Sequence, residues 1–184
     1  MSLRSQPARR QIAWVVCCMV AFVMTAAASA GASPRGVPAA APRCTVAHLE
    51  IWLGLGLGGG TAGSTFYPLE FSNVGHGTCT LNGFPGVSGF KSGGGRLGPA
   101  ASRNGQHHAT VTLAPGATAH AILRIVDSGA VCSPSVTAAG LKVFPPGARR
   151  WESIPFSFSA CAHRGVLVVG PVRAGVGIPG FTTS

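Results

Sequence analysis

Acidic residues are scarce in this chain. Only four of its 184 residues are Asp or Glu, against 14 Lys plus Arg: Glu50, Glu70, Asp127 and Glu152. Glycoside hydrolysis needs two converging carboxylates, and an activated nucleophile needs a base that is itself oriented by a third group. We therefore expect no catalytic residue, and an extracellular hydrolase is the least favoured function. We also expect no cofactor, since no glycine-rich segment leads from a strand into a helix.

The chain also lacks the spacings that are typical of metal and redox sites. It contains six histidines but no His-x-His and no His-x-x-x-His, and it has no Cys-x-x-Cys. We therefore predict no metal site and interpret His107 and His108 as solvated loop residues. The adjacent His107 and His108 leave one alternative open, an accessory protein that binds a metal through this loop.

Long basic runs are absent too, which argues against a nucleic-acid partner. The basic residues are scattered, and Tyr67 is the only tyrosine available for stacking on a base. Arg4, Arg9 and Arg10 lie in a predicted signal, so 11 of the 14 basic residues and all 4 acidic ones remain after export, a net charge of about +7. This charge favours anionic partners such as envelope polymers or acidic lipids, and the alternative is a role in solubility alone.

Residues 1–30 are typical of a signal peptide. A start with three arginines precedes an uncharged apolar stretch over residues 12–24, and Ala28-Ser29-Ala30 matches a small-residue cleavage site. We therefore expect a secreted protein with no membrane span after cleavage. An uncleaved anchor is the alternative, since residues 12–30 carry no charge over a length that can span a bilayer. Cys17 follows a valine rather than a small residue, which argues against lipid attachment.

Beyond the signal, we predict a Pro- and Ala-rich linker over residues 31–43 and a flexible tail over residues 174–184. Between them, over residues 44–173, the dominant hydrophobic period is two. In residues 49–57 five aliphatic side chains alternate with other residues. Successive side chains of a strand point to opposite faces, so a strand here places all five aliphatics on one face. A helix through residues 49–58 is disfavoured, because Gly54, Gly56 and Gly58 would each cost about 1 kcal/mol.

Similar alternation recurs along the domain and is interrupted by Gly- and Pro-rich turns. The alternating runs lie around residues 67–71, 110–113, 119–125, 141–143 and 154–158. Short strands separated by such turns favour a sandwich or a barrel. We predict a single all-β domain, an immunoglobulin-like antiparallel β-sandwich joined by two disulfides.

Four cysteines follow the signal: Cys44, Cys79, Cys132 and Cys161. An even number in an exported chain indicates disulfides, and four cysteines allow three pairings. We prefer Cys44–Cys79 with Cys132–Cys161, because each pair then joins the flanks of nearby strands. Loop closure of this length contributes about 3.5–4 kcal/mol per bond on the chain-entropy estimate.

Several short motifs, in their order along the chain, resemble a known family. They are Cys44, Ala62-Gly63-Ser64, Phe71-Ser72-Asn73, the segment CTLNGFPGV from Cys79 to Val87, the segment VTLAPGATA from Val111 to Ala119, Cys132, Pro145-Pro146-Gly147 and Cys161. This set is similar to the family called domain of unknown function 4232, over about residues 44–170. The resemblance implies a disulfide-bearing β-sandwich in secreted or lipid-anchored actinobacterial proteins. It implies no catalytic residues, since none are established for the family.

Two kinds of strand residue remain to be interpreted. Trp52 falls on the face opposite the aliphatics of residues 49–57, and we interpret it as core. If that face is exposed instead, Trp52 is a candidate ligand contact for a glycan or a protein. Glu50 and Glu70 are interpreted as residues of a solvent face or as partners of arginines.

These features favour a non-catalytic protein. We predict a monomeric binding or structural module that is secreted or associated with the cell envelope, where its partner is an envelope polymer or protein. The alternative is an accessory extracellular protein that binds a ligand or a metal.

Overall fold

Strands make up nearly all of the regular structure in this protein. The computed structural model describes residues 40–55 and 59–177, all of them in one compact unit that begins at Ala39. The predicted signal peptide and most of the predicted linker lie outside the described residues. In the described part of the chain the only helical elements are two short 3-10 turns, η1 (Val46–His48) and η3 (Ser128–Ala130). The all-β prediction is confirmed.

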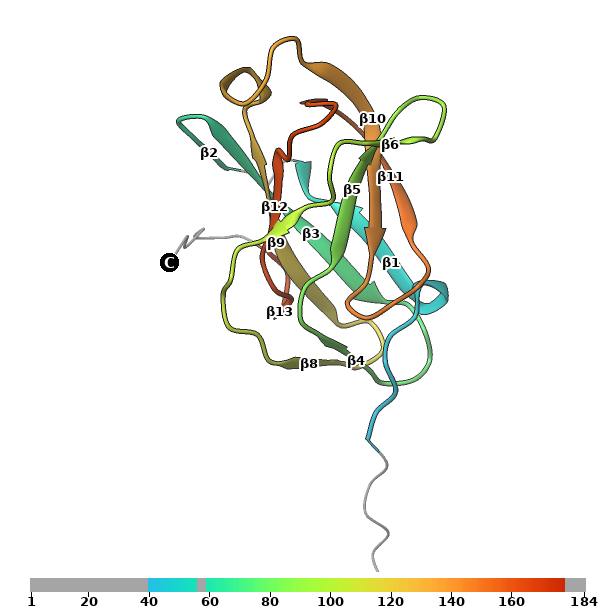
Figure 1. Ribbon diagram of the computed structural model, residues 1–184. Coiled ribbons are helices and arrows are strands. Elements are labelled where there is room, and N and C mark those ends of the chain that lie inside the picture. Colours follow the sequence, from blue (N-terminus) through green and yellow to red (C-terminus); the bar gives the residue numbers. More distant parts are fainter. Residues whose placement is uncertain (1–39, 56–58, 178–184) are drawn as a thin grey trace, which may run out of the picture. The chain divides into compact units, whose positions relative to one another are not determined.

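The described residues form thirteen strands, which are joined mostly by short turns (Figure 1). They are β1 (Leu49–Leu53), β2 (Gly59–Thr61), β3 (Ser64–Asn73), β4 (Cys79–Asn82), β5 (Gly86–Phe90), β6 (Arg96–Leu97), β7 (Ser102–Arg103), β8 (Thr110–Leu113), β9 (Thr118–Val126), β10 (Val136–Phe144), β11 (Glu152–Ala160), β12 (Leu167–Val169) and β13 (Arg173–Ala174).

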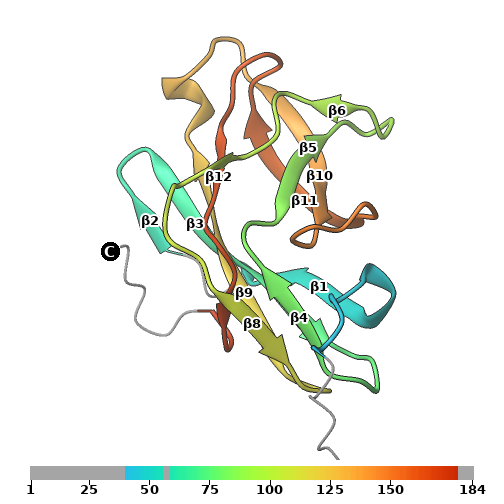
Figure 2. The same ribbon diagram turned by 60° about the horizontal axis from the view of Figure 1, so that its bottom comes forward.

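The strands form two main sheets and one small one. The first sheet has the order β1-β3-β9-β12-β7, with β2 also paired to β3 and β13 to β9. The second has the order β11-β10-β5-β6, and β4 pairs with β8 in a two-stranded sheet. Figure 2 shows β11, β10 and β5 on one side of the domain and β3 and β9 on the other. All strand pairs are antiparallel except β12 with β7. The immunoglobulin-like arrangement stays a prediction.

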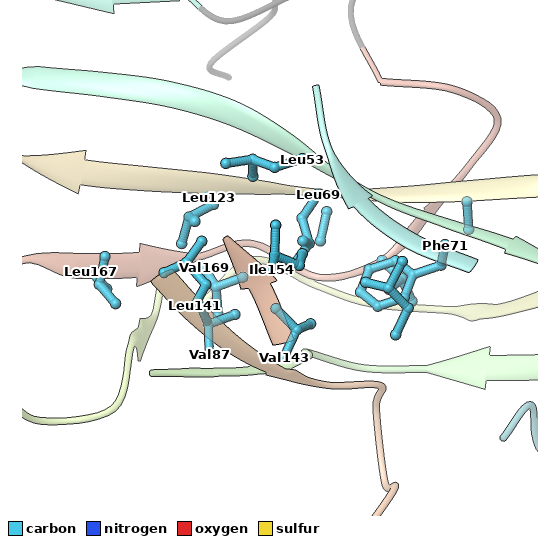
Figure 3. Close-up of a cluster of buried hydrophobic side chains, with 14 of the residues drawn as sticks. Leu53, Leu69, Phe71, Val87, Leu123, Leu141, Val143, Ile154, Leu167 and Val169 are labelled. Atoms are coloured by element: carbon cyan, nitrogen blue, oxygen red, sulfur yellow. The ribbon is translucent and has the colours of Figure 1, made fainter. Parts of the chain in front are cut away.

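The core lies between the inner faces of the two main sheets. Leu69 and Leu123 from the first sheet approach Val87, Leu141 and Val143 from the second (Figure 3), and each of these side chains is buried. They belong to one continuous hydrophobic cluster. The period-two pattern of the sequence produces this arrangement, because every second residue of a strand reaches the same face.

The pairing of β3 with β9 is the longest ladder in the domain, with nine residue pairs from Ser64↔Val126 to Ser72↔Thr118. Leu69 and Phe71 on β3 are fully buried on the inner face, as is Ala121 on β9. Glu70 and His120, which pair with each other, lie on the outer face of the same ladder.

The first strand is shorter than the sequence predicts. β1 ends at Leu53, and Leu55 is 59% exposed, so the prediction of five aliphatics on one buried face is wrong for Leu55. Leu57 lies outside the described residues. The reason is Pro68, the next residue of β3 in register: its carbonyl accepts the Gly54 N–H at 2.9 Å, but a proline has no N–H to donate back.

Both ends of the domain reach further than the sequence suggests. The Thr80 N–H donates to the Pro42 carbonyl at 2.8 Å, inside the predicted linker. In the predicted tail, Ala174 belongs to β13, and the Gly175 N–H donates to the Thr118 carbonyl at 2.9 Å. Residues 174–177 therefore lie on the first sheet, because their backbone donors find acceptors there. The rest of the predicted tail is outside the described residues.

Both predicted disulfide pairings are confirmed. Cys44–Cys79 has a Cα–Cα distance of 4.9 Å and joins the segment before η1 to β4. Cys132–Cys161 has a Cα–Cα distance of 6.0 Å and joins the segment after η3 to the end of β11. The second bond therefore links a loop of the first sheet to a strand of the second.

Replacing the second disulfide should destabilise the domain strongly. Cys132 and Cys161 are 29 residues apart, so Cys132→Ser with Cys161→Ser should lower the free energy of unfolding by about 3.5 kcal/mol, through the larger conformational entropy of the unfolded chain. Urea denaturation followed by tryptophan fluorescence measures this loss. The corresponding Cys44 and Cys79 variant, with a separation of 35, should lose a similar amount. A loss below about 1 kcal/mol for both variants would contradict a stabilising role.

Candidate functional site: an arginine-rimmed pocket

Three arginines from distant parts of the sequence line one pocket where the chain enters the domain. Arg43 comes just before the first cysteine of the domain, and Arg149 and Arg150 follow the loop after β10. We call the cavity the arginine-rimmed pocket, and its volume is about 390 Å³. It is lined by Arg43, Cys44, Thr45, Val46, Ala47, Pro146, Gly147, Ala148, Arg149 and Arg150.

A tight turn places two of these arginines. The Ala148 N–H donates to the Pro145 carbonyl at 2.9 Å, and Gly147 has a φ of 72°. Proline at the second position and a positive-φ glycine at the third are typical of a type II turn. The turn reverses the chain between β10 and β11, so Arg149 and Arg150 follow it directly.

The same glycine leaves room for the third arginine. A Cβ atom added to Gly147 would lie 2.9 Å from Nη1 of Arg43. The backbone of Arg43 is held by its neighbours, since it bridges to Thr80 and the Cys44 N–H donates to the Thr80 carbonyl at 3.0 Å. The Cys44–Cys79 disulfide also joins this segment covalently to β4, so the backbone of Arg43 is fixed in position.

A second cavity lies on the other side of Arg43. It also measures about 390 Å³, shares Arg43, Pro146 and Gly147 with the first, and adds Thr80, Asn82 and Thr110. The Asn82 amide donates to Oγ1 of Thr110 at 2.7 Å. Arg43 therefore separates a mostly aliphatic pocket with a cationic rim from a cavity that offers hydroxyl and amide groups.

This arrangement is suited to an anionic ligand. No acidic residue lines either cavity. Guanidinium groups remain protonated at any physiological pH, and their planar donors match the oxygens of phosphates and carboxylates. From the sequence alone, the basic residues are interpreted as scattered and this cluster is missed, because Arg43 and Arg149 are separated by 106 positions, which hides their proximity.

The comparisons with known proteins concern the same domain. A family model described as Domain of unknown function (DUF4232) matches residues 44–173. The chain belongs to this family. No curated protein and no solved structure matches the chain. The DUF4232 match includes Arg149 and Arg150, and Arg43 directly precedes it.

Trp52 is the ligand contact that the sequence singled out. It lies on the outer face of β1, opposite Glu70 in the ladder with β3, and it is 36% exposed. Its interpretation as core is therefore wrong, because the outer face of β1 is not covered by the second sheet. Trp52 stays a candidate contact, but it does not line the arginine-rimmed pocket.

Glu70 differs most from its prediction. It is fully buried, although the sequence placed it on a solvent face or beside an arginine. Its Oε1 accepts the Gly177 N–H at 2.7 Å, and its Oε2 has no hydrogen-bond partner in the described structure. The C-terminal segment covers this carboxyl, and a contact between residues 107 positions apart leaves no signal in the local pattern.

Burial raises the pKa of the Glu70 carboxyl, while the hydrogen bond from Gly177 and the nearby His120 act in the opposite direction. His120 also holds the C-terminal segment, since its Nδ1–H donates to the Gly175 carbonyl at 2.8 Å. Glu70 and His120 do not line the cavities described here, and we assign the pair a role in holding residues 175–177 on the sheet.

The histidine loop shows no metal centre. Over residues 40–55 and 59–177, no three or more His, Cys, Asp or Glu side chains come close enough to hold an ion. The ring of His108 contacts Phe84 edge-on at 5.7 Å, and the His107 carbonyl accepts a hydrogen bond from Arg173 at 3.0 Å. None of the helices found in these ranges is long and apolar enough to cross a membrane.

Glu70→Gln should stabilise the domain at neutral pH. A carboxyl whose pKa is raised in the folded state favours folding at low pH, and this contribution is lost as the pH rises through the folded-state pKa. Glutamine cannot ionise but still offers an oxygen to the Gly177 N–H. We expect a melting temperature above that of wild type at pH 7.5 and a smaller gain at pH 4.

The matched control is Glu50→Gln, which removes an exposed carboxylate from the outer face of β1 and should leave the melting temperature unchanged. Glu70→Ala should destabilise the domain, since it removes the acceptor of the Gly177 N–H. Equal melting curves for Glu70→Gln and wild type from pH 4 to pH 8 would show that burial imposes no penalty on the charge.

Proposed function

We propose that this protein is a monomeric, non-catalytic binding module of the cell envelope or the extracellular space. Its ligand is an anionic polymer that also carries hydroxyl groups, such as a phosphate- or carboxylate-bearing polysaccharide. The single observation that carries this proposal is the arginine-rimmed pocket, whose lining contains three arginines and no acidic residue.

Three further observations support the proposal. Two disulfides fit an oxidising, extracellular environment. The exported chain is expected to be strongly basic, with a net charge of about +7 from 11 basic and 4 acidic residues, which attracts polyanions over a distance. The neighbouring cavity with Thr80, Asn82 and Thr110 offers the groups that bind sugar hydroxyls, so a polymer of alternating sugar and anionic groups can contact both cavities.

The proposal of a non-catalytic role depends on Glu70, the carboxylate that lies beside His120 in the described structure. Glu70 is fully buried beneath Gly177, so a substrate could reach it only if residues 175–177 moved away. The alternative of metal binding through His107 and His108 is tested by adding copper or zinc, which should leave the melting temperature unchanged.

Replacing the paired arginines should weaken binding of a polyanion. Arg149→Ala with Arg150→Ala should reduce affinity for a phosphate-bearing polysaccharide about tenfold or more, since a hydrogen bond to a charged group contributes about 1.5–3 kcal/mol. Isothermal titration calorimetry at two salt concentrations measures this change. Lys91→Ala with Arg164→Ala removes the same charge elsewhere and should change affinity less than about twofold.

Three probes identify the source of the anion: the phosphate-bearing polysaccharide, its neutral counterpart of equal length, and vesicles containing an acidic phospholipid. The proposal requires binding to the first and much weaker binding to the other two. Equal losses in the two double variants would show that binding depends on net charge alone, and it would overturn the assignment of the pocket.

A further inference from the structure

A third cavity opens between the two main sheets, towards the other end of β11. It has a volume of about 470 Å³ and lies between the β2–β3 hairpin, the end of β9 and residues 156–159 of β11. We call it the sheet cleft. In Figure 1 the β2–β3 hairpin and the turn after β9 lie at the opposite end of the domain from the loop that carries Arg149 and Arg150.

Aromatic side chains form the inner surface of the sheet cleft. Tyr67, Phe156 and Phe158 are only partly buried, although Ile154 on the same strand as the phenylalanines is 8% exposed and Leu69 next to Tyr67 is fully buried. The rings of Tyr67 and Phe156 meet edge-on at 5.1 Å, and Phe156 stacks on Phe158 at 5.8 Å. Inward-facing side chains of β3 and β11 are therefore buried in the core along one part of each strand and partly accessible to solvent in the sheet cleft.

The cleft also exposes a free strand edge. β11 is the terminal strand of the second sheet, and β10 is its only partner. Within the described chain, the backbone of residues 156–159 makes no hydrogen bond outside that pairing. An unpaired row of N–H and C=O groups beside a groove is the arrangement to which extended peptides add as a further strand.

The charge of the cleft is opposite to that of the domain. Asp127 is the one charged residue in its lining, and the rest of the rim consists mainly of serine, threonine and glycine. The Oδ1 atom of Asp127 accepts the Gly129 N–H at 3.0 Å, which fixes the carboxylate at the start of η3. A peptide with a basic residue is therefore complementary to this cleft.

We propose that the sheet cleft binds an extended segment of a partner protein by strand addition to β11. An apolar side chain of the segment enters among Tyr67, Phe156 and Phe158, and a basic side chain lies beside Asp127. The volume is within the range of about 300–1,000 Å³ that is typical of ligand sites. The free backbone row favours a peptide over a lipid or a glycan, since only a peptide presents alternating N–H and C=O groups at the spacing of a strand. This inference does not depend on the proposed function, which uses a different site.

The test starts from a displayed library of random seven-residue peptides, selected on the oxidised full-length protein. We expect selected sequences to combine an aromatic or aliphatic residue with Lys or Arg. For the best synthetic peptide, N-methylation of alternate residues on the hydrogen-bonding side should reduce affinity at least about tenfold, because it removes backbone donors. Hydrogen exchange should show new protection at residues 156–159.

Three variants test the individual contacts. Phe156→Ala should weaken the peptide about tenfold or more, while Phe84→Ala, a partly buried phenylalanine outside the cleft, should have little effect. Asp127→Asn should reduce the preference for the Lys- or Arg-bearing peptide over its neutral analogue, and it keeps an acceptor for the Gly129 N–H. The double variant Arg149→Ala with Arg150→Ala should bind the peptide with wild-type affinity. Failure of the proposed polyanion binding can then be distinguished from failure of peptide binding.

Several outcomes would overturn the inference. They are the failure of the library to yield any binding peptide, protection that appears away from β11, and affinity that N-methylation leaves unchanged. The last result would identify the cleft as a pocket for small apolar groups. If Phe156→Ala fails to fold, the N-methyl series and the exchange pattern on the unmodified protein still decide between these outcomes.

Discussion

The domain depends on the nine-pair ladder between β3 and β9. Its inner face carries fully buried side chains, among them Leu69, Phe71 and Leu123, which pack against the second sheet. The other strands of the first sheet attach to this ladder directly or through β12: β1 and β2 pair with β3, β12 and β13 pair with β9, and β7 pairs with β12. Disruption of this ladder would remove the support of every other element of the first sheet, and with it one wall of the sheet cleft.

The local features of the fold were predictable and the long-range ones were not. Alternation marks β3, β9 and β11 because a strand with one buried face must repeat every two residues, and the cysteine pairing followed from strand proximity. The end of β1 depends on Pro68, which is a partner in another strand. The burial of Glu70 depends on Gly177, and the arginine-rimmed pocket depends on a turn more than 100 residues from Arg43. No local pattern encodes such contacts.

Two sites of contrasting chemistry occur on one small domain. The arginine-rimmed pocket lies at the start of β11, beside the loop from β10, and its rim is cationic. The sheet cleft lies further along the same strand, and Asp127 is its one charged residue. A single rigid hairpin, β10–β11, therefore separates a position suited to a polyanion from one suited to a basic peptide. Together, the two proposed sites would bring a protein partner close to an anionic polymer.

The Cys132–Cys161 bond has a consequence for the sheet cleft. Asp127 and Ser128 form one wall of the cleft, and they lead within a few residues to Cys132, whose sulfur is bonded to the residue that follows β11. The Ser128 carbonyl also accepts the Cys132 N–H at 2.8 Å. The loop that carries the acidic wall is thus tied to the strand that offers the free edge. Without this bond, only hydrogen bonds would hold the loop that carries Asp127, so the position of the acidic wall relative to β11 depends on an oxidising environment.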